Sequence, residues 1–525
     1  MASKFTLNNN LKYLKMKKII LIVAVVFFSG AAIAQRALPE EFAYKIKTEG
    51  FQNSQIDSIA FWMTDYAGDR LTASEKWNRS KELAIEKLKK LGFTNAHSEV
   101  AGDFPRGGWD NQKTYIAMTA PYYSHFFGIP VAWTGNADVK GEVVLFNPKS
   151  IAEIDNFKGK IAGKIVLLPS TEQYEINFKP NASRYTDEDL AGLERDPRSN
   201  TGVSSGRRPS YAVITKEQIE LQNAISGFLK TEKPAVIINN SGSFNVPRSS
   251  GVNYRKGNPE PTAELLLPIE AHGRMVRLIT NGIPVSMEIE IQNKFTDNGI
   301  VENIIAEIPG TDPKLKDEVV VIGAHFDSWH GGTGAADNAS GCIVMTEALR
   351  IIKESGIAPR RTIRLALWGG EEQGLYGSKY YVQNYLYDTE TNQPKKDYDK
   401  FALYLNMDYG SGKYRGIYLE TNDMAVPFFK AWSKALETLD FKTFSPRVAG
   451  STDHVSFNRY GLPGFQFIQD RLEYGRGYHT PMDTYERLLL SDLRSNAVIT
   501  AWLALSAAMD DNKIPKRPVM ATPQR

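Results

Sequence analysis

The 525-residue sequence has very little cysteine and no marked excess of charge of either sign. Its one cysteine, Cys342, excludes an intrachain disulfide and zinc sites built from several thiolates, such as zinc fingers. The net charge of +3 gives no electrostatic basis for binding nucleic acid. With 42% hydrophobic and 23% charged residues, the composition is that of a globular protein, and the length predicts two or three domains.

Long apolar runs are also scarce, and the clearest one lies near the N-terminus. Several lysines precede the apolar residues Ile19–Phe28, and small residues ending in Ala32-Ile33-Ala34 follow. This order predicts a secretory signal peptide over residues 1–34 that is cleaved after Ala34, with an uncleaved anchor as the alternative. No other stretch is long and apolar enough to cross a bilayer. We therefore expect a periplasmic or secreted protein with no stable membrane span after cleavage.

The spacing of apolar residues changes twice along the rest of the chain. It begins with helical spacing, continues as short β-rich runs, and ends with strands that alternate with helices. This pattern predicts an α/β fold, a mixed and mostly parallel sheet with helices on both faces, together with a β-rich inserted domain. The predicted segments are a signal peptide (1–34), the N-terminal part of a catalytic domain (35–125), the β-rich insert (126–295), the main catalytic domain (296–512) and a C-terminal tail (513–525).

Several individual elements can be placed. Ser74 is expected to cap a helix that Gly92 ends, and Ser491 to cap the last helix. The polar stretch 181–209 is expected to form a long exposed loop. Strands are predicted at 319–324, 362–368 and 401–407.

Histidine and acidic residues follow these strands, where binding sites form in α/β sheets. His325 and Asp327 come directly after the strand at 319–324, and their alternate positions put both side chains on the same side. His325 could bind a metal through one ring nitrogen. The Asp327 carboxylate could then hold the ring in place through its second nitrogen. Asp337 lies among small residues before the next helix, and it could equally be the N-cap of that helix.

Two adjacent glutamates, Glu371 and Glu372, follow the strand at 362–368. Neighbouring carboxylates are costly to bury unless a positive charge lies between them. A metal would explain both, because one glutamate could bind it while the other accepts a proton from water. Two solvated glutamates in the first turn of a helix are the alternative. Asp408 ends the next strand, and His479 lies on a later loop.

The ordered set of these residues predicts a metal centre. Histidine is scarce, at seven residues, yet two of the seven fall in the set. Nitrogen and oxygen donors of this kind suit Zn²⁺, with Co²⁺ or Mn²⁺ as substitutes. If Asp337 bridges two Zn²⁺ ions, one ion takes His325, Asp337 and Asp408, and the other takes Asp337, Glu372 and His479.

The motifs that contain these residues resemble peptidase family M28, the zinc aminopeptidases and carboxypeptidases. In residues 296–512 the resemblance rests on H-x-D, G-x-x-D-N-x-S-G, E-E-x-G-L-x-G-S, N-M-D and Y-H-T-x-x-D-T. It also covers 64–99, through T-D-x-x-G-x-R-L-T-x-S and the helix after it. Within the insert, Phe157–Lys160 and 163–168 resemble a protease-associated (PA) domain.

The resemblance implies the same metal ligands, with Asp337 bridging and a cis peptide bond after it. It implies that Asp327 orients His325, and that Glu371 is the general base that activates a water shared by the two metals. Tyr478, beside a ligand, could stabilise the oxyanion or simply pack there. The resemblance suggests that Asp453 and His454 line the substrate cleft, although a structural hydrogen-bonding pair fits equally.

The implied function is a two-zinc exopeptidase acting on peptides, with aminopeptidase as the leading expectation. A carboxypeptidase or dipeptidase is the alternative, since Arg471, Tyr474 and Arg476 come shortly before His479 and could bind a C-terminal carboxylate. Other classes are a non-catalytic, receptor-like binding protein and a single-zinc cyclising transferase such as glutaminyl cyclase. The complete set of ligands argues against a receptor-like protein. The PA-like insert argues against a cyclising transferase. A G-x-S-x-G match at 202–206 lacks the strand and helix of a nucleophile elbow. We make no prediction of oligomeric state.

Overall fold

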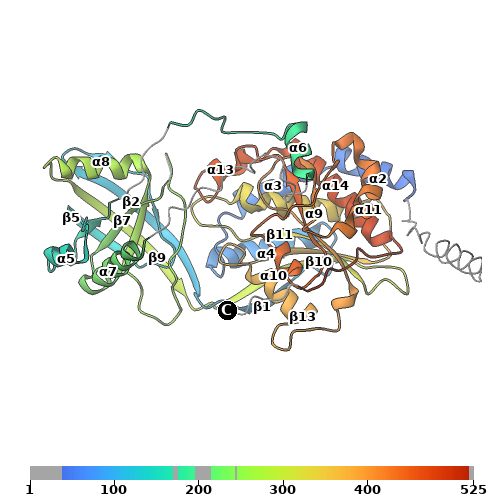
Figure 1. Cartoon of the computed structure of the whole chain (residues 1–525), viewed down its shortest axis with the longest axis horizontal. Helices are drawn as coiled ribbons and strands as arrows, with labels where there is room; N and C mark the ends of the chain where they lie inside the picture. The colour runs from blue at the N-terminus through green and yellow to red at the C-terminus, as the bar shows by residue number, and fades with distance from the viewer. Residues whose placement is uncertain (1–37, 170–175, 196–214, 243–244, 520–525) are drawn as a thin grey trace, which may run out of the picture.

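Two lobes, each built on an eight-stranded sheet, make up the protein (Figure 1). The computed structural model describes residues 38–169, 176–195, 215–242 and 245–519. The predicted signal peptide and the G-x-S-x-G match lie outside these ranges. Within them, no helix has the length and apolar character needed to cross a membrane.

The first sheet forms what we call the α/β lobe. Its strands, in spatial order, are β1 (His97–Asp103), β10 (Ile300–Ile308), β12 (Thr362–Trp368), β11 (Val319–His325), β15 (Phe401–Asn406), β18 (Gly464–Gln469), β16 (Tyr414–Tyr418) and β17 (Thr443–Ser445). The central strands β12, β11, β15 and β18 are parallel, and antiparallel pairs lie toward both edges. The predicted mixed α/β sheet and its three expected strands are therefore confirmed.

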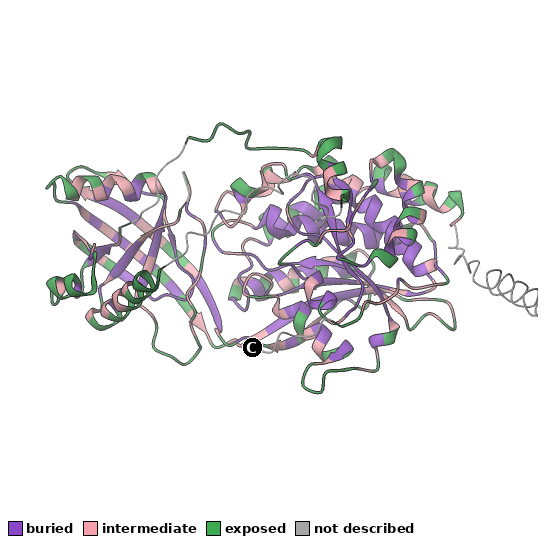
Figure 2. Ribbon diagram, in the orientation of Figure 1, coloured by how far each residue is buried: buried purple, intermediate pink, exposed green. Residues whose placement is uncertain are grey.

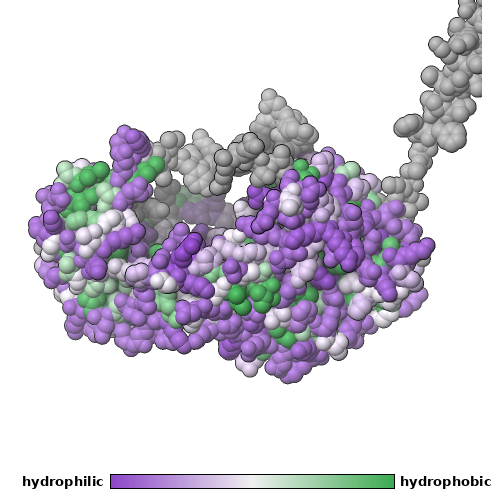
Figure 3. All heavy atoms as spheres, turned by 90° about the horizontal axis from the view of Figure 1, so that it is seen from below, coloured by the Kyte–Doolittle hydropathy of each residue, from purple (hydrophilic) through white to green (hydrophobic). Residues whose placement is uncertain are grey.

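Helices cover both faces of this sheet. They are α2 (Glu40–Gln52), α3 (Ile56–Phe61), α4 (Glu75–Lys90), α9 (Ser340–Glu354), α10 (Tyr376–Tyr381), α11 (Val426–Trp432), α12 (His454–Asn458), α13 (Tyr474–Gly477) and α14 (Leu490–Met509). On β11, Val320 and Ile322 pack toward α9 and α14, whereas Val321 packs toward α10 and α12. Figure 2 shows the resulting core as a buried centre of strands and helices, and hydrophilic residues cover most of the face in Figure 3.

The expected helix caps have different outcomes. Ser74 does cap α4, because its hydroxyl accepts the N–H of Trp77 at 2.9 Å. Ser491 does not cap α14. That helix begins at Leu490, and the N–H of Leu493 reaches back 3.1 Å to the carbonyl of Leu489, which makes Leu489 the N-cap.

The second sheet forms the β-rich lobe. Its strands, in spatial order, are β3 (Ser124–His125), β2 (Gly108–Ala120), β9 (Ser286–Thr296), β5 (Ala137–Leu145), β6 (Ile165–Leu167), β7 (Val236–Asn240), β8 (Ala263–Leu267) and β4 (Ile129–Pro130). Its helices are α5 (Ile151–Ile154), α7 (Lys216–Glu232) and α8 (Ile269–Thr280). Because β2 pairs with β9 from Gly108 onward, this sheet includes residues before the predicted insert boundary at 126.

One segment of the predicted insert lies on the α/β lobe, and we call residues 183–195 the strap. It contains α6 (Asp187–Glu194), although a loop was expected there. The helix forms because Thr186 and Asp189 make a reciprocal capping box. It packs beside β17, and the chain before it crosses from one lobe to the other (Figure 1).

Gly341 lies in the first turn of α9, where the helix packs against the ends of strands β11 and β15. A Cβ atom on Gly341 would lie 2.6 Å from the Met407 carbonyl oxygen and 2.7 Å from the Ala324 Cβ. We expect Gly341→Ala to lower the free energy of unfolding by about 1–3 kcal/mol, measured by thermal unfolding. Gly192→Ala on α6 is the control, because a Cβ there meets nothing within 4 Å. Equal melting temperatures for the two variants would contradict the expectation.

Candidate metal centre

The ends of several elements bring histidines and carboxylates together at one edge of the α/β sheet. Carboxyl ends of parallel strands meet at the same edge, which places residues distant in sequence side by side. The residues are His325 at the end of β11, Asp337 just before α9, Glu372 after β12, Asp408 after β15 and His479 after α13.

These side chains form two groups that share Asp337. In each group the candidate ligand atoms lie within 4.8 Å of one another. Asp337 Oδ1 is 3.3 Å from His325 Nε2, which in turn is 3.8 Å from an Asp408 oxygen. Asp337 Oδ2 is 3.2 Å from His479 Nε2, which is 2.9 Å from a Glu372 oxygen. One oxygen of Asp337 therefore faces each group.

Polar atoms at this site are buried without hydrogen bonds. Although His479 Nε2 lies within 3.2 Å of both carboxylates, Asp337 Oδ2, Glu372 Oε1 and His479 Nε2 make no hydrogen bond of suitable geometry with the described residues. Buried polar atoms are normally paired, so unpaired oxygen and nitrogen atoms this close together fit a cation between them. The donor set thus fits the metal chemistry expected from the sequence.

Glu371 lies next to both groups but belongs to neither. Its Oε2 is 4.0 Å from His325 Nε2. Burial raises the pKa of the Glu371 carboxyl well above its ordinary value; His325 opposes this effect and Asp408 adds to it. A carboxyl with a raised pKa can accept a proton and give it up again near neutral pH.

Asp327 holds the turn that contains the two glutamates. Its buried carboxylate accepts the N–H of Glu371 at 3.1 Å, the N–H of Glu372 at 3.2 Å and the hydroxyl of Thr72 at 3.2 Å. His325 Nδ1 lies 3.0 Å from the Asp327 carbonyl oxygen and 3.7 Å from its Oδ1. The contacts to the glutamate turn were not anticipated, and the orienting of His325 stays a prediction.

The backbone around Asp337 is held by residues that the sequence reasoning missed. Asp483 accepts the N–H of Ala336 at 2.6 Å and that of Asp337 at 2.9 Å. Asp483 belongs to the motif Y-H-T-x-x-D-T, so its position was visible but its role was not. The Asp337–Asn338 peptide bond is cis, as the resemblance implied. Helix α9 has Ala339 as its N-cap, so the N-cap alternative for Asp337 is wrong.

The three candidate substrate-contacting residues lie in different surroundings. The Tyr478 ring stacks on the His479 ring, with centroids 3.6 Å apart. Asp453 and His454 are fully buried, and burial raises the pKa of Asp453 to about 7. His454 Nε2 lies 3.3 Å from a Glu420 oxygen. Their contact with substrate stays a prediction.

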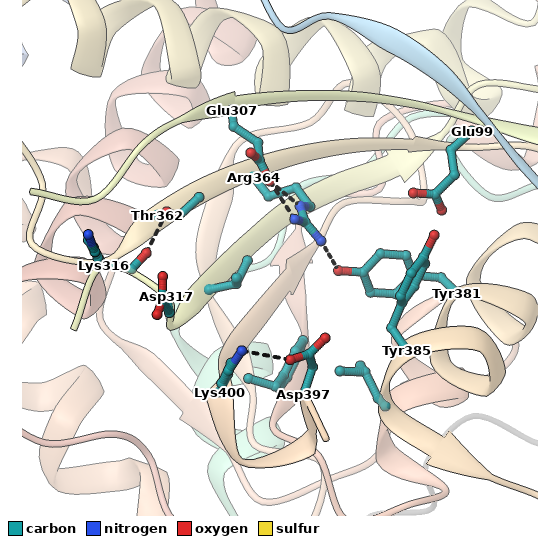
Figure 4. Close-up of a pocket in the computed structure, with 13 residues that line it drawn as sticks. Glu99, Glu307, Lys316, Asp317, Thr362, Arg364, Tyr381, Tyr385, Asp397 and Lys400 are labelled. Atoms are coloured by element: carbon teal, nitrogen blue, oxygen red, sulfur yellow. Dashed lines mark hydrogen bonds and ion pairs between the residues drawn. The ribbon is translucent and has the colours of Figure 1, made fainter. Parts of the chain in front are cut away.

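A polar pocket of about 360 Å³ lies at the opposite end of the strands (Figure 4). Val319, Thr362 and Phe401, the first residues of three central strands, line it. Arg364 there is already paired with Glu307 and Tyr381. No histidine or cysteine is found among the described residues that line it, and both candidate ligand groups lie at the other edge of the sheet.

Comparison with known proteins agrees with this geometry. Residues 303–503 match the model of peptidase family M28. These residues, which contain all five candidate ligands, form a domain of peptidase family M28. Members of this family are metallo-exopeptidases, and this chain is therefore a hydrolase of that type.

Relatives of this M28 peptidase include proteins with two kinds of name. Carboxypeptidase Q of Rattus norvegicus is 29% identical over 473 residues, 89% of this chain and 88% of that protein. Aminopeptidase YwaD of Bacillus subtilis (strain 168) is 30% identical over 234 residues, 44% of this chain and 49% of that protein. The crystal structure of a peptidase M28 precursor from Shewanella amazonensis SB2B shares the fold, with a TM-score of 0.64 and 21% identity, covering 91% of this chain and 99% of that one.

Removing the charge of Asp327 tests the support of the glutamate turn. We expect Asp327→Asn to lower the free energy of unfolding of the metal-free M28 peptidase by about 1–3 kcal/mol, because an amide nitrogen cannot accept the N–H groups of the turn. Thermal unfolding would measure the loss. Thr72→Val, which removes one of the three bonds, should have a smaller effect. A larger effect for Thr72→Val would contradict this order.

Proposed function

We propose that this peptidase is a two-zinc exopeptidase that removes N-terminal residues from peptides. One observation carries the proposal: two candidate ligand groups share Asp337, while Glu371 lies beside both without joining either. Co²⁺ or Mn²⁺ would substitute for zinc at such sites. In this assignment His325, Asp337 and Asp408 would hold one zinc, and Asp337, Glu372 and His479 would hold the other.

The zinc ions, when bound, supply Lewis acidity and lower the pKa of water. Glu371 takes a proton from the attacking water, and its raised pKa allows the carboxyl to hold the proton until it reaches the leaving amine. Asp327 keeps Glu371 in place through the backbone of the turn. We assign to the Tyr478 hydroxyl the role of donating a hydrogen bond to the developing oxyanion.

The excess of negative charge favours the N-terminus of a peptide. Besides the three carboxylates assigned to the metals, Asp453 is fully buried near the site, and the Glu371 side chain there is 11% exposed. A free ammonium group would be stabilised beside them, and Asp453 and His454 would line this part of the cleft.

A carboxypeptidase or dipeptidase is the second candidate. It is supported by the likeness to carboxypeptidase Q over most of both chains. It is also supported by Arg471, an exposed residue shortly before His479, because guanidinium groups bind carboxylates well.

We also propose that the β-rich lobe is a PA-like insert, since the PA-like motif continues into its central strand β6. Residues 1–34 would be a signal peptide, so that the enzyme acts in the periplasm or outside the cell.

Replacing Glu371 tests the assignment of the base. We expect Glu371→Gln to lower kcat by about 10²–10⁴-fold and to leave the zinc content unchanged, because the amide cannot accept the proton. Steady-state kinetics and metal analysis would measure both. Glu437→Gln, on the exposed surface, is the matched control. Near-normal turnover of Glu371→Gln would rule out the role.

The choice of substrate end is tested with blocked peptides. We expect leucine p-nitroanilide and C-terminally amidated peptides to be hydrolysed and N-acetylated peptides to be left intact, because the N-terminal ammonium is what the acids bind. Hydrolysis of N-acetylated peptides that have a free C-terminus would favour the carboxypeptidase. Chelator-sensitive activity with two bound zinc ions is expected. Binding of peptides without hydrolysis would favour a receptor-like protein. A single bound zinc ion would favour a cyclising transferase.

A further inference from the structure

The loop that carries His479 has an unfavourable backbone. Leu472 has a φ of 46° and His479 a φ of 57°. Residues with a Cβ atom rarely adopt this left-handed conformation, and they keep it only where surrounding contacts hold them. His325 ends β11, Asp337 lies just before α9, and Asp408 follows β15 closely, whereas His479 lies on a loop between short elements and has a left-handed backbone.

The strap supplies the first set of contacts. Ser183 and Leu472 exchange two backbone hydrogen bonds, of 3.0 and 2.8 Å. Arg184 makes ion pairs with Asp470 at 2.7 Å and with Asp492 at 2.8 Å. The strap therefore holds the loop at the first of its two left-handed residues.

A second segment of the predicted insert holds the other end of the loop. The N–H of Ser249 donates to the carbonyl of His479 at 2.7 Å, and the Ser249 hydroxyl donates to the carbonyl of His330 at 2.7 Å. Ser249 is only 5% exposed. The Arg248 guanidinium donates to the Gly475 carbonyl at 2.9 Å and lies over the Tyr478 ring.

We propose that residues 183–184 and 248–249 clamp this loop at two points and thereby position His479 for the second metal group. These residues act through His479 and are positioning residues. The α/β lobe adds an ion pair between Arg487 and Glu473, but the bonds to the two left-handed residues come from the clamp. The identity of the metal rests on the proposed function, whereas the holding of the loop does not.

Two variants test the clamp at its two independent points. Arg184→Ala removes both ion pairs of the strap, and the R248A/S249A double variant removes the side-chain contacts at the other point. Lys140→Ala is the control, because Lys140 pairs with Glu288 in the sheet of the β-rich lobe. In the metal-free full chain, we expect amide hydrogen exchange over 470–480 to be at least about tenfold faster in either test variant and unchanged in the control.

Zinc retention gives a second readout. In competition with a chelator, each test variant should lose the second zinc about tenfold more readily, keep the first zinc as the wild type does, and regain kcat when zinc is added. Exchange and zinc retention equal to the wild type in both variants would overturn the clamp. If one variant fails to fold, the result for the other variant decides whether the clamp exists.

The two proposals can fail separately. If the wild type binds fewer than two zinc ions, the proposed function fails. Hydrogen exchange in the metal-free protein still decides whether the clamp exists.

Discussion

The main constraint on the site is the mutual repulsion of carboxylates gathered at one edge of the sheet of the α/β lobe. Asp337, Glu372, Asp408 and Glu371 lie close to His325 and His479, and three polar atoms there make no hydrogen bond with the part of the chain that the structure describes. In a medium of low dielectric constant, such a cluster is stable only if cations share its charge or if protons neutralise part of it. The arrangement therefore combines a donor set that fits cations with a carboxyl of raised pKa outside that set, which are the two requirements of metal-assisted hydrolysis.

A surrounding layer of acceptors keeps this cluster in place. Asp327 and Asp483 each accept two backbone N–H groups, one pair from the glutamate turn and one from the segment that contains Asp337. Arg70, fully buried, donates to the carbonyls of Thr333 and Gly334 in the loop before Asp337. These bonds fix the backbone, so the geometry of the side chains does not rely on the metal alone.

The two lobes cooperate at the loop of His479. The strap and the segment at Ser249 reach this loop from the predicted insert, and they contact both residues with left-handed backbone. These contacts hold the backbone beside a candidate ligand. The backbone of a candidate ligand in the α/β lobe is therefore held in part by residues of the predicted insert.

Local patterns in the sequence determined much of the α/β lobe and the identity of the clustered residues. The apolar strands before His325, Glu371 and Asp408, and the cap at Ser74, depend on contacts between near neighbours or on periodic burial, which a sequence displays directly. Only the tertiary structure decided that the strap forms a helix on the other lobe, that β2 joins the second sheet, and that Ser249 bonds His479. These features depend on backbone groups brought together from distant segments, and since every residue has the same backbone groups, no side-chain pattern reveals the pairing.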